Sequence, residues 1–269
     1  MSFQGRGRGF VADRPARQVR RFAALRGGVS SAPESSDLTS FEPGVLDQGD
    51  TNACTAHAKI AATCISAGAQ GIKLPFLPSP CDLYRIALSL DRKAQFGGSF
   101  PALQDTGAEP GQIELAIREW GLTPMVTPAP DGRLSDCTPE SVVAELDFGL
   151  LVRAAHHLVS GNYQIDEVGD ELLLETKIAL SLGHPVNLGF WADHAFDHIQ
   201  PSSPALELQD RSSAGGWHYA TLVGHEGDRF RLLNSWGLEW GDLGHCWVGP
   251  AWLRQCVGIY ACSVSKDIA

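Results

Sequence analysis

The chain has 269 residues, of which 43% are hydrophobic and 8% aromatic, and a formal net charge of −10. This composition is typical of a folded soluble protein, and the length suits one large domain or two lobes. No stretch approaches the roughly 18 consecutive apolar residues of a transmembrane helix, so no membrane span or membrane partner is expected.

Charge is distributed unevenly along the chain. Residues 1–28 hold seven arginines and one acid, Asp13, for a net charge of +6, which leaves −16 on the remaining residues. A basic arm on an acidic body can fold back onto that body. The alternative is a solvated or nucleic-acid-binding tail. Because the body is acidic and no aromatic residues alternate with the basic ones, nucleic acid is not expected as a partner.

The N-terminus lacks the apolar segment of a secretory signal, which predicts a cytoplasmic protein and leaves export without such a signal as an alternative. An organelle transit peptide is disfavoured by the single serine among residues 1–28. The seven cysteines include no Cys-x-x-Cys pair, so we expect reduced, buried thiols rather than zinc knuckles.

Apolar spacing and Gly/Pro punctuation predict a helical first half and a β-rich second half. Helices are expected over 54–68, 81–92, 111–120 and 171–182, with further helical pattern in 140–159, and strands over 185–190, 219–224, 229–234 and 245–248. A loop is expected at Gly97–Gly98 and a proline-rich surface crossing over 123–140. We therefore divide the chain into a basic arm (1–45), a helical lobe (46–160) and a β-rich lobe (161–269).

Cys54 is the candidate nucleophile. Gly49 and Asp50 ahead of it disfavour helix, whereas the alanine-rich stretch behind it favours helix, so Cys54 is expected in a first helical turn. The N–H groups and dipole of a helix start favour a thiolate. Gln48, on the incoming loop, could direct its amide at the same point and stabilise an oxyanion.

A thiol nucleophile needs a base, and the base needs an orienting partner. His218 lies at the start of one predicted strand and Asn234 at the end of the next, and nearly equal arms join them through a turn at Gly227. A hairpin would therefore place His218 beside Asn234. Trp236 could shield their hydrogen bond from water.

These segments together resemble the papain-like cysteine peptidase (C1) family over about residues 45–260. The resemblance rests on Gln48 and Cys54, on Gly216-Trp217-His218-Tyr219-Ala220, and on the run Asn234-Ser-Trp-Gly-Leu-Glu-Trp-Gly241. It implies a two-lobe α+β fold: a helical lobe carrying Cys54, and an antiparallel, β-barrel-like lobe carrying His218 and Asn234, with the substrate cleft between them.

The resemblance also implies individual roles. Gln48 and the Cys54 N–H would hold the oxyanion, and Trp236 would be the shield. Gly107 and Ala108, within Thr106–Pro110, would form a glycine-rich cleft wall that binds an extended peptide. Trp217 and Trp236 are the other candidate substrate-binding residues. Gly9–Pro15 resembles the leader of bacterial members without a conventional long propeptide, so the arm is a candidate intramolecular regulator. No metal or organic cofactor is implied.

Two departures from the family pattern stand out. Thr51 and Thr55 occupy positions where the family has a cysteine and an aromatic residue, so one family disulfide is absent. Cys54 and His218 are 164 residues apart, and Cys54 and Asn234 are 180 apart. Both separations exceed the family's usual span of about 130–150, which predicts an insertion within 123–215.

The expected function is cysteine-dependent endopeptidase action on peptide or protein substrates through a thioester. Two alternatives remain open: acyl transfer to an amine at the same site, or a catalytically silent protein that binds peptides. His57, near Cys54 on the helix, lacks an orienting asparagine and is expected to be structural. The pair His194 and His198 has helical zinc-ligand spacing but no evident third ligand, so a solvated helix turn is preferred.

Overall fold

The computed structural model describes residues 9–11, 20–96, 103–125, 133–144, 146 and 160–264. Its helices are α1 (Phe22–Leu25), η1 (Thr39–Phe41), α2 (Cys54–Ala69), α3 (Pro80–Phe96), α4 (Pro110–Trp120), η2 (Ser141–Val143), α6 (Gly169–Ser181), α7 (His194–Asp197) and α8 (Pro250–Leu253). Its strands are β1 (Arg20–Arg21), β2 (Ser35–Asp37), β3 (Ser160–Gln164), β4 (Val186–Ala192), β5 (Gly216–Glu226), β6 (Arg229–Leu233), β7 (His245–Val248) and β8 (Val257–Val264).

The strands form one eight-stranded sheet in the order β1-β3-β8-β4-β5-β6-β7, with β2 added beside β5. Only the β1–β3 pair is parallel among the described pairings. The long strand β5 pairs with β4 along its first part and with β2 along its last part, while β6 occupies its other edge. The sheet is open, which corrects the expected barrel-like closure: β1 and β7 end the hydrogen-bonded path and do not pair with each other.

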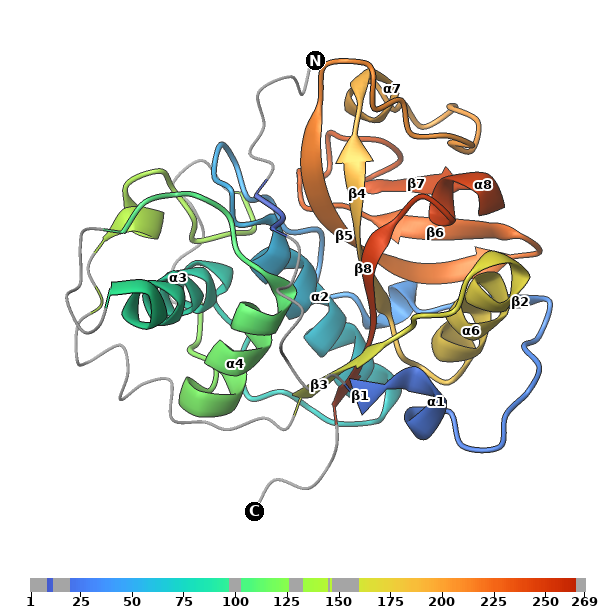
Figure 1. Cartoon of the computed structure of the whole chain (residues 1–269), viewed down its shortest axis with the longest axis horizontal. Coiled ribbons are helices and arrows are strands. Elements are labelled where there is room, and N and C mark those ends of the chain that lie inside the picture. Colours follow the sequence, from blue (N-terminus) through green and yellow to red (C-terminus); the bar gives the residue numbers. More distant parts are fainter. Residues whose placement is uncertain are drawn as a thin grey trace.

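Helix α2 lies between the helices α3 and α4 and the sheet. Figure 1 shows α3 and α4 on one side of α2 and strands β4, β5 and β8 on the other. Alanines at 56, 58, 61 and 62 are buried along α2. Small side chains let a helix approach a sheet closely, and Thr221 of β5 donates its hydroxyl hydrogen to the Ala58 carbonyl at 3.2 Å. The α+β fold predicted from the sequence is confirmed.

Most predicted elements agree with the structure in kind and place. Strands β4 to β7 and helices α2, α3, α4 and α6 all correspond to predicted elements. Helix α4 ends at Gly121, whose φ of 80° suits the predicted glycine C-cap. Within 140–159, the described residues form only the short η2. The expected Gly97–Gly98 loop, residues 126–132 of the proline-rich crossing, residues 147–159 of the helical pattern and arm residues 12–15 lie outside the described part.

The segment 20–45, which we assigned to the arm, packs on the body. Phe22 is fully buried and Leu38 is buried at 5% exposure. Strand β2 extends the sheet beside the end of β5. Deletion of residues 20–45 would therefore remove part of the core and one strand of the sheet.

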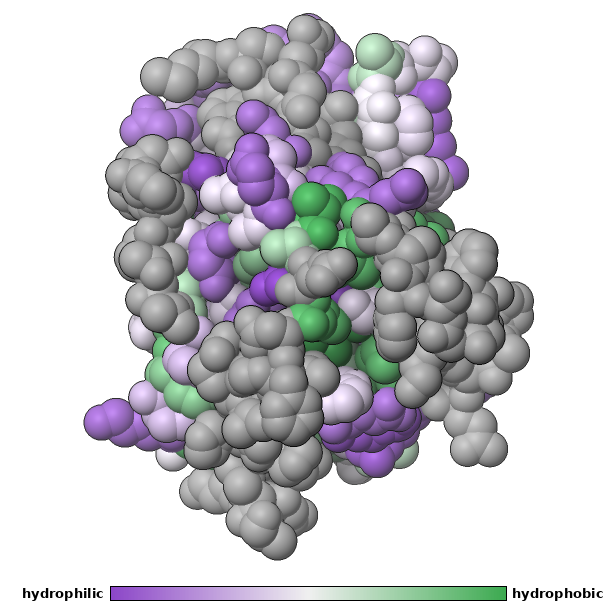
Figure 2. Space-filling model, turned by 90° about the vertical axis from the view of Figure 1, so that its left-hand side faces the viewer, coloured by the Kyte–Doolittle hydropathy of each residue, from purple (hydrophilic) through white to green (hydrophobic). Residues whose placement is uncertain are grey.

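The helical side of the molecule has a mixed surface. Figure 2 views the face that carries α3 and α4, and described hydrophobic residues gather near its middle with hydrophilic residues around them. None of the helices in the described part of the chain is long and apolar enough to cross a membrane.

A buried lysine joins α2 to the elements around it. The side chain of Lys59 is 2% exposed, and its ammonium group lies 2.8 Å from Glu114 of α4. It also donates to Asn162 of β3 at 2.8 Å and to Cys262 of β8 at 3.5 Å. A buried ammonium group requires such partners, because transfer from water is costly.

Lys59→Met should destabilise the protein by about 3–5 kcal/mol, because it leaves the Glu114 carboxylate without its cation. The free energy of unfolding in urea measures this loss. Adding Glu114→Gln to Lys59→Met should recover part of it, since no uncompensated charge then remains. Equal stability of the wild type and the single variant would show that the ion pair contributes nothing.

Candidate active site

Cys54 is the first residue of α2, as predicted, and its side chain is fully buried. Burial raises the pKa of the thiol to about 11, although the backbone N–H groups of Gly9, Tyr219 and Thr55 act in the opposite direction. The helix start was expected to favour the thiolate. In this structure burial dominates, so the neutral thiol is the stable form at neutral pH.

The N-terminal arm covers this thiol. Phe10 belongs to the same apolar cluster as Cys54 and is itself 7% exposed. Its ring stacks on Tyr219 with centroids 5.1 Å apart and lies 6.0 Å from the ring of Trp217. A side chain at position 189 would collide with Phe10, because a Cβ there would come within 2.5 Å of the ring. Gly189 thus leaves the space that the aromatic ring fills.

His218 and Asn234 meet in the hairpin of β5 and β6. Asn234 Oδ1 accepts a hydrogen bond from His218 Nε2 at 2.8 Å and another from the Ser235 backbone N–H at 2.8 Å. Since the backbone N–H can only donate, it fixes the orientation of the asparagine amide, and His218 Nε2 must carry a hydrogen. In the neutral ring Nδ1 is then the basic nitrogen. The thiol of Cys54 interacts with the backbone of Tyr219, the residue next to this histidine.

Aromatic rings enclose the histidine. The ring of Trp236 lies 4.9 Å from that of His218, and Phe190 meets the imidazole edge-on at 5.5 Å. Both Trp236 and His218 are fully buried. The structure therefore places Trp236 against the histidine–asparagine pair, where its ring excludes water.

Both polar atoms of the Gln48 side-chain amide form hydrogen bonds. Its NH₂ group donates to the Thr51 carbonyl at 2.6 Å, and its Oε1 accepts a hydrogen bond from the Ser235 hydroxyl at 2.7 Å. Ser235 adjoins Asn234, so one short segment orients both the histidine partner and the predicted oxyanion donor. Ser235 was not among the predicted site residues, although its place in the Asn-Ser-Trp-Gly run was a signal for it.

Gly107 and Ala108 lie beside the arm, where a peptide-binding wall was predicted. The Ala108 N–H donates to the Gly9 carbonyl at 2.9 Å, and the Val11 N–H donates to the Ala108 carbonyl at 3.4 Å. Phe10 and Ala108 form a parallel bridge. Gly107 has a φ of 83°, and a Cβ there would lie 2.1 Å from the Gly9 carbonyl oxygen. This wall therefore binds extended backbone, here that of the chain's own arm.

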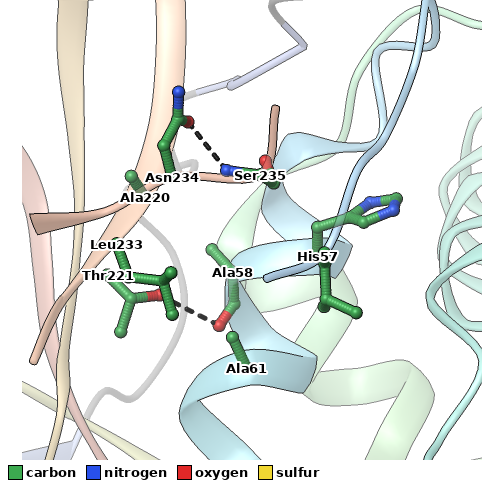
Figure 3. A pocket seen from close by; sticks show the side chains of 9 residues that line it. His57, Ala58, Ala61, Ala220, Thr221, Leu233, Asn234 and Ser235 are labelled. Atoms are coloured by element: carbon green, nitrogen blue, oxygen red, sulfur yellow. Dashed lines mark hydrogen bonds between the residues drawn. The ribbon is translucent and has the colours of Figure 1, made fainter. Parts of the chain in front are cut away.

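His57 faces away from the candidate site. Figure 3 shows its ring on the opposite side of α2 from Asn234. Its Nδ1 donates to the Ala53 carbonyl at 2.9 Å, and its Nε2 accepts from the Ser135 hydroxyl at 3.0 Å. Burial lowers its pKa to about 4, so the ring is neutral at neutral pH. The expected structural role agrees with this placement.

Two groups of side chains have the residue types of metal ligands. The rings of His194 and His198 lie 4.0 Å apart at an exposed helix turn, and no third ligand joins them among the described residues. The one group of at least three candidate ligands in the described part is Cys81, Asp136 and Cys137. This group does not include Cys54, His218, Asn234 or Gln48.

Asp105 connects the loop ahead of Cys54 to the cleft wall. Its carboxylate accepts the backbone N–H of Asn52 at 2.9 and 3.0 Å and the hydroxyl of Tyr84 at 2.7 Å. The Tyr84 hydroxyl oxygen in turn accepts the Gly107 N–H at 2.8 Å. No sequence motif pointed to Asp105, because its partners are distant in the sequence. These bonds join two segments without a disulfide.

Asp105→Ala should reduce the free energy of unfolding by about 2–3 kcal/mol, because it removes charge-assisted hydrogen bonds at a half-buried site. Urea denaturation measures the effect. Asp50→Ala, at an exposed position in the same loop, is the matched control and should change stability by no more than about 0.5 kcal/mol. Equal effects of the two substitutions would contradict the bracing role.

Comparison with known proteins adds evidence about the fold. No protein-family model and no curated protein matches the sequence. The crystal structure of xylellain, a cysteine protease from Xylella fastidiosa, is similar, with a TM-score of 0.72 and 20% identity over 97% of each chain. Procathepsin B S9 from Trypanosoma congolense is similar with a TM-score of 0.66 and 16% identity, and the match covers 97% of this chain and 88% of the procathepsin chain. Recombinant stem bromelain precursor is similar with a TM-score of 0.63 and 16% identity, and the match covers 98% of this chain and 79% of the bromelain precursor. The chain therefore has the fold of the papain-like cysteine proteases, as its motifs indicated.

Proposed function

We propose that the protein is a cysteine-dependent endopeptidase. The observation that carries the proposal is the hydrogen-bonded pair of His218 and Asn234, enclosed by aromatic rings next to the start of the Cys54 helix. Gln48, held by Ser235, is the fourth member. A catalytically silent binding protein would not need these polar groups to be buried and mutually oriented, since each costs free energy to desolvate.

The chemistry follows from these groups once a peptide replaces the arm. Cys54 transfers its proton to His218 Nδ1, and the thiolate attacks the peptide carbonyl carbon. The Cys54 N–H and the Gln48 amide stabilise the oxyanion. His218 then protonates the leaving amine, and water attacks the thioester to release the acid and regenerate the thiol. Asn234 keeps the imidazole in the tautomer whose Nδ1 can accept the proton.

Acyl transfer is the alternative with the same first half. An amine rather than water would then attack the thioester. Mass spectrometry of the products in the presence of an added amine separates hydrolysis from transfer.

We further propose that the arm regulates this site. Phe10 and Gly9 cover the thiol, and the Gly9 carbonyl is bonded to Ala108. The Gly9 backbone also forms a hydrogen bond with the Cys54 thiol. The arm is therefore placed to occupy the position of a peptide beside Cys54.

Cys54→Ala should abolish hydrolysis of unstructured peptides, measured with residues 1–11 deleted so that the cleft is open. In the same background, Gln48→Ala should lower kcat by about 10²- to 10³-fold, because one oxyanion donor is lost. Cys64→Ala is the control, since Cys64 is a half-buried thiol elsewhere on α2. Full activity of the Cys54→Ala chain would sink the assignment.

Deletion of residues 1–11, or Phe10→Ala, should speed alkylation of Cys54 at pH 7.5 at least roughly tenfold. Exposure to water lowers the raised pKa of the thiol. At a fixed pH below that pKa, the thiolate fraction rises about tenfold for each unit by which the pKa falls. The wild-type rate should still be rising near pH 11, whereas the variants should level off at lower pH.

Val11→Ala is the matched control, because that side chain is 38% exposed. Measurements at low and high salt separate the contribution of the arginines from that of Phe10. Identical labelling of all chains at every pH and salt concentration would show that the arm does not guard the thiol.

A further inference from the structure

Two buried cysteines and an aspartate converge at the start of α3. Cys81 lies in the first turn of this helix, while Asp136 and Cys137 belong to the segment 133–144. Their sulfur and carboxylate oxygen atoms all lie within 4.8 Å of one another. The cysteines are 3% and 0% exposed. Residues more than fifty positions apart thus point their ligand atoms into one small buried space.

The charge balance of this cluster favours a cation. Each of the three groups becomes an anion when it loses its proton, and that anionic form is the one that binds a metal ion. Among the described residues, no lysine or arginine forms an ion pair with Asp136. A divalent cation would offset the charge of deprotonated ligands that the protein leaves uncompensated.

The donor atoms indicate the class of cation. Two thiolates with one carboxylate suit zinc, whereas magnesium and calcium take oxygen ligands. Two sulfurs bound to a tetrahedral zinc ion lie roughly 3.8 Å apart, given zinc–sulfur bonds of about 2.3 Å. The ligand atoms of the three residues lie within 4.8 Å of one another, so the two sulfurs would need to approach each other by no more than about 1 Å to bind zinc.

Neighbouring groups would support bound metal. The Ser141 hydroxyl oxygen lies 3.2 Å from Cys81 Sγ and could supply a fourth ligand, as could water. Asp136 accepts hydrogen bonds from the Ser79 hydroxyl and from the Cys81 backbone N–H, the latter at 3.2 Å. Such bonds orient a ligating carboxylate before metal arrives.

We propose that Cys81, Asp136 and Cys137 form a structural binding site for zinc or a similarly thiophilic divalent ion. The bound ion would join the start of α3 to the segment 133–144. Its influence would extend towards the nucleophile, because the Cys137 N–H donates to Ser135 Oγ at 3.1 Å and Ser135 bonds to His57, which holds the Ala53 carbonyl. The ion would brace the base of the Cys54 helix without contacting substrate.

The test uses the full chain with Cys54→Ala, which removes the candidate active-site thiol as a competing metal ligand. The protein is reduced, stripped with a chelator and titrated with Co²⁺, then with Zn²⁺ as competitor. The expected result is about one ion per chain, thiolate-to-cobalt charge-transfer absorption, and a higher Tm with zinc. The exposed pair His194 and His198 cannot give that absorption.

Variants locate the site. Cys81→Ser and Cys137→Ser should abolish the charge-transfer band, and Asp136→Asn should weaken zinc binding at least roughly tenfold. Cys246→Ala, which changes a buried thiol on β7, should leave binding intact. Circular dichroism identifies any variant that fails to fold, and Asp136→Asn keeps both thiols and nearly the same volume.

Three outcomes would overturn the proposal. One is the absence of stoichiometric binding, and another is adventitious binding only, seen as undiminished metal content in the serine variants. The third is a disulfide between Cys81 and Cys137. In the untreated protein, mass spectrometry would then find the two cysteine peptides linked, with a mass lower by two hydrogens. The protein would also fail to bind metal after reduction. That oxidation would need an external oxidant such as a small disulfide and would give Asp136 no role.

Discussion

The close packing of α2 against β5 is the constraint on which the rest of the candidate site depends. Cys54 starts α2 and His218 lies on β5, so their relative position is that of the helix on the strand. Buried alanines permit the approach, and the Thr221 hydroxyl lies within hydrogen-bonding distance of both the Ala58 carbonyl of α2 and Asn187 Oδ1 of β4. Because this contact is formed by backbone and small side chains, the geometry does not depend on flexible groups.

Much of this arrangement is predictable because it is local. The hairpin turn at Gly227 brings the start of β5 near the end of β6, so counting along the two strands was enough to place His218 near Asn234. The register aligns Thr221 with Leu233, and the two side chains meet across a diagonal rather than as direct partners. Helix α2 likewise follows from its alanine-rich sequence and the glycine and aspartate ahead of it. In both cases short-range propensity and tertiary structure agree.

What could not be predicted depends on residues far apart in the sequence. The parallel pairing of β1 with β3 and the open sheet carry no local signal. Phe22 lies in an arginine-rich stretch, and only its burial shows that the body includes it. Asp105 and Tyr219 gain their roles from contacts with other segments. A sequence pattern predicts individual helices and strands well, but it predicts poorly which residues form the contacts between them.

The state of Cys54 shows why the arm and the site must be considered together. A helix start stabilises a thiolate through N–H groups and the dipole, whereas burial destabilises any charge. The arm supplies both effects at once, since Phe10 excludes water while the Gly9 N–H faces the sulfur. Burial outweighs the donors around the sulfur, so the pKa of the Cys54 thiol is raised. The close approach needs glycine at positions 9 and 107, because a Cβ at either would collide with backbone atoms. Specific backbone contact, rather than the net charge of the arm, is therefore what aligns it with the cleft.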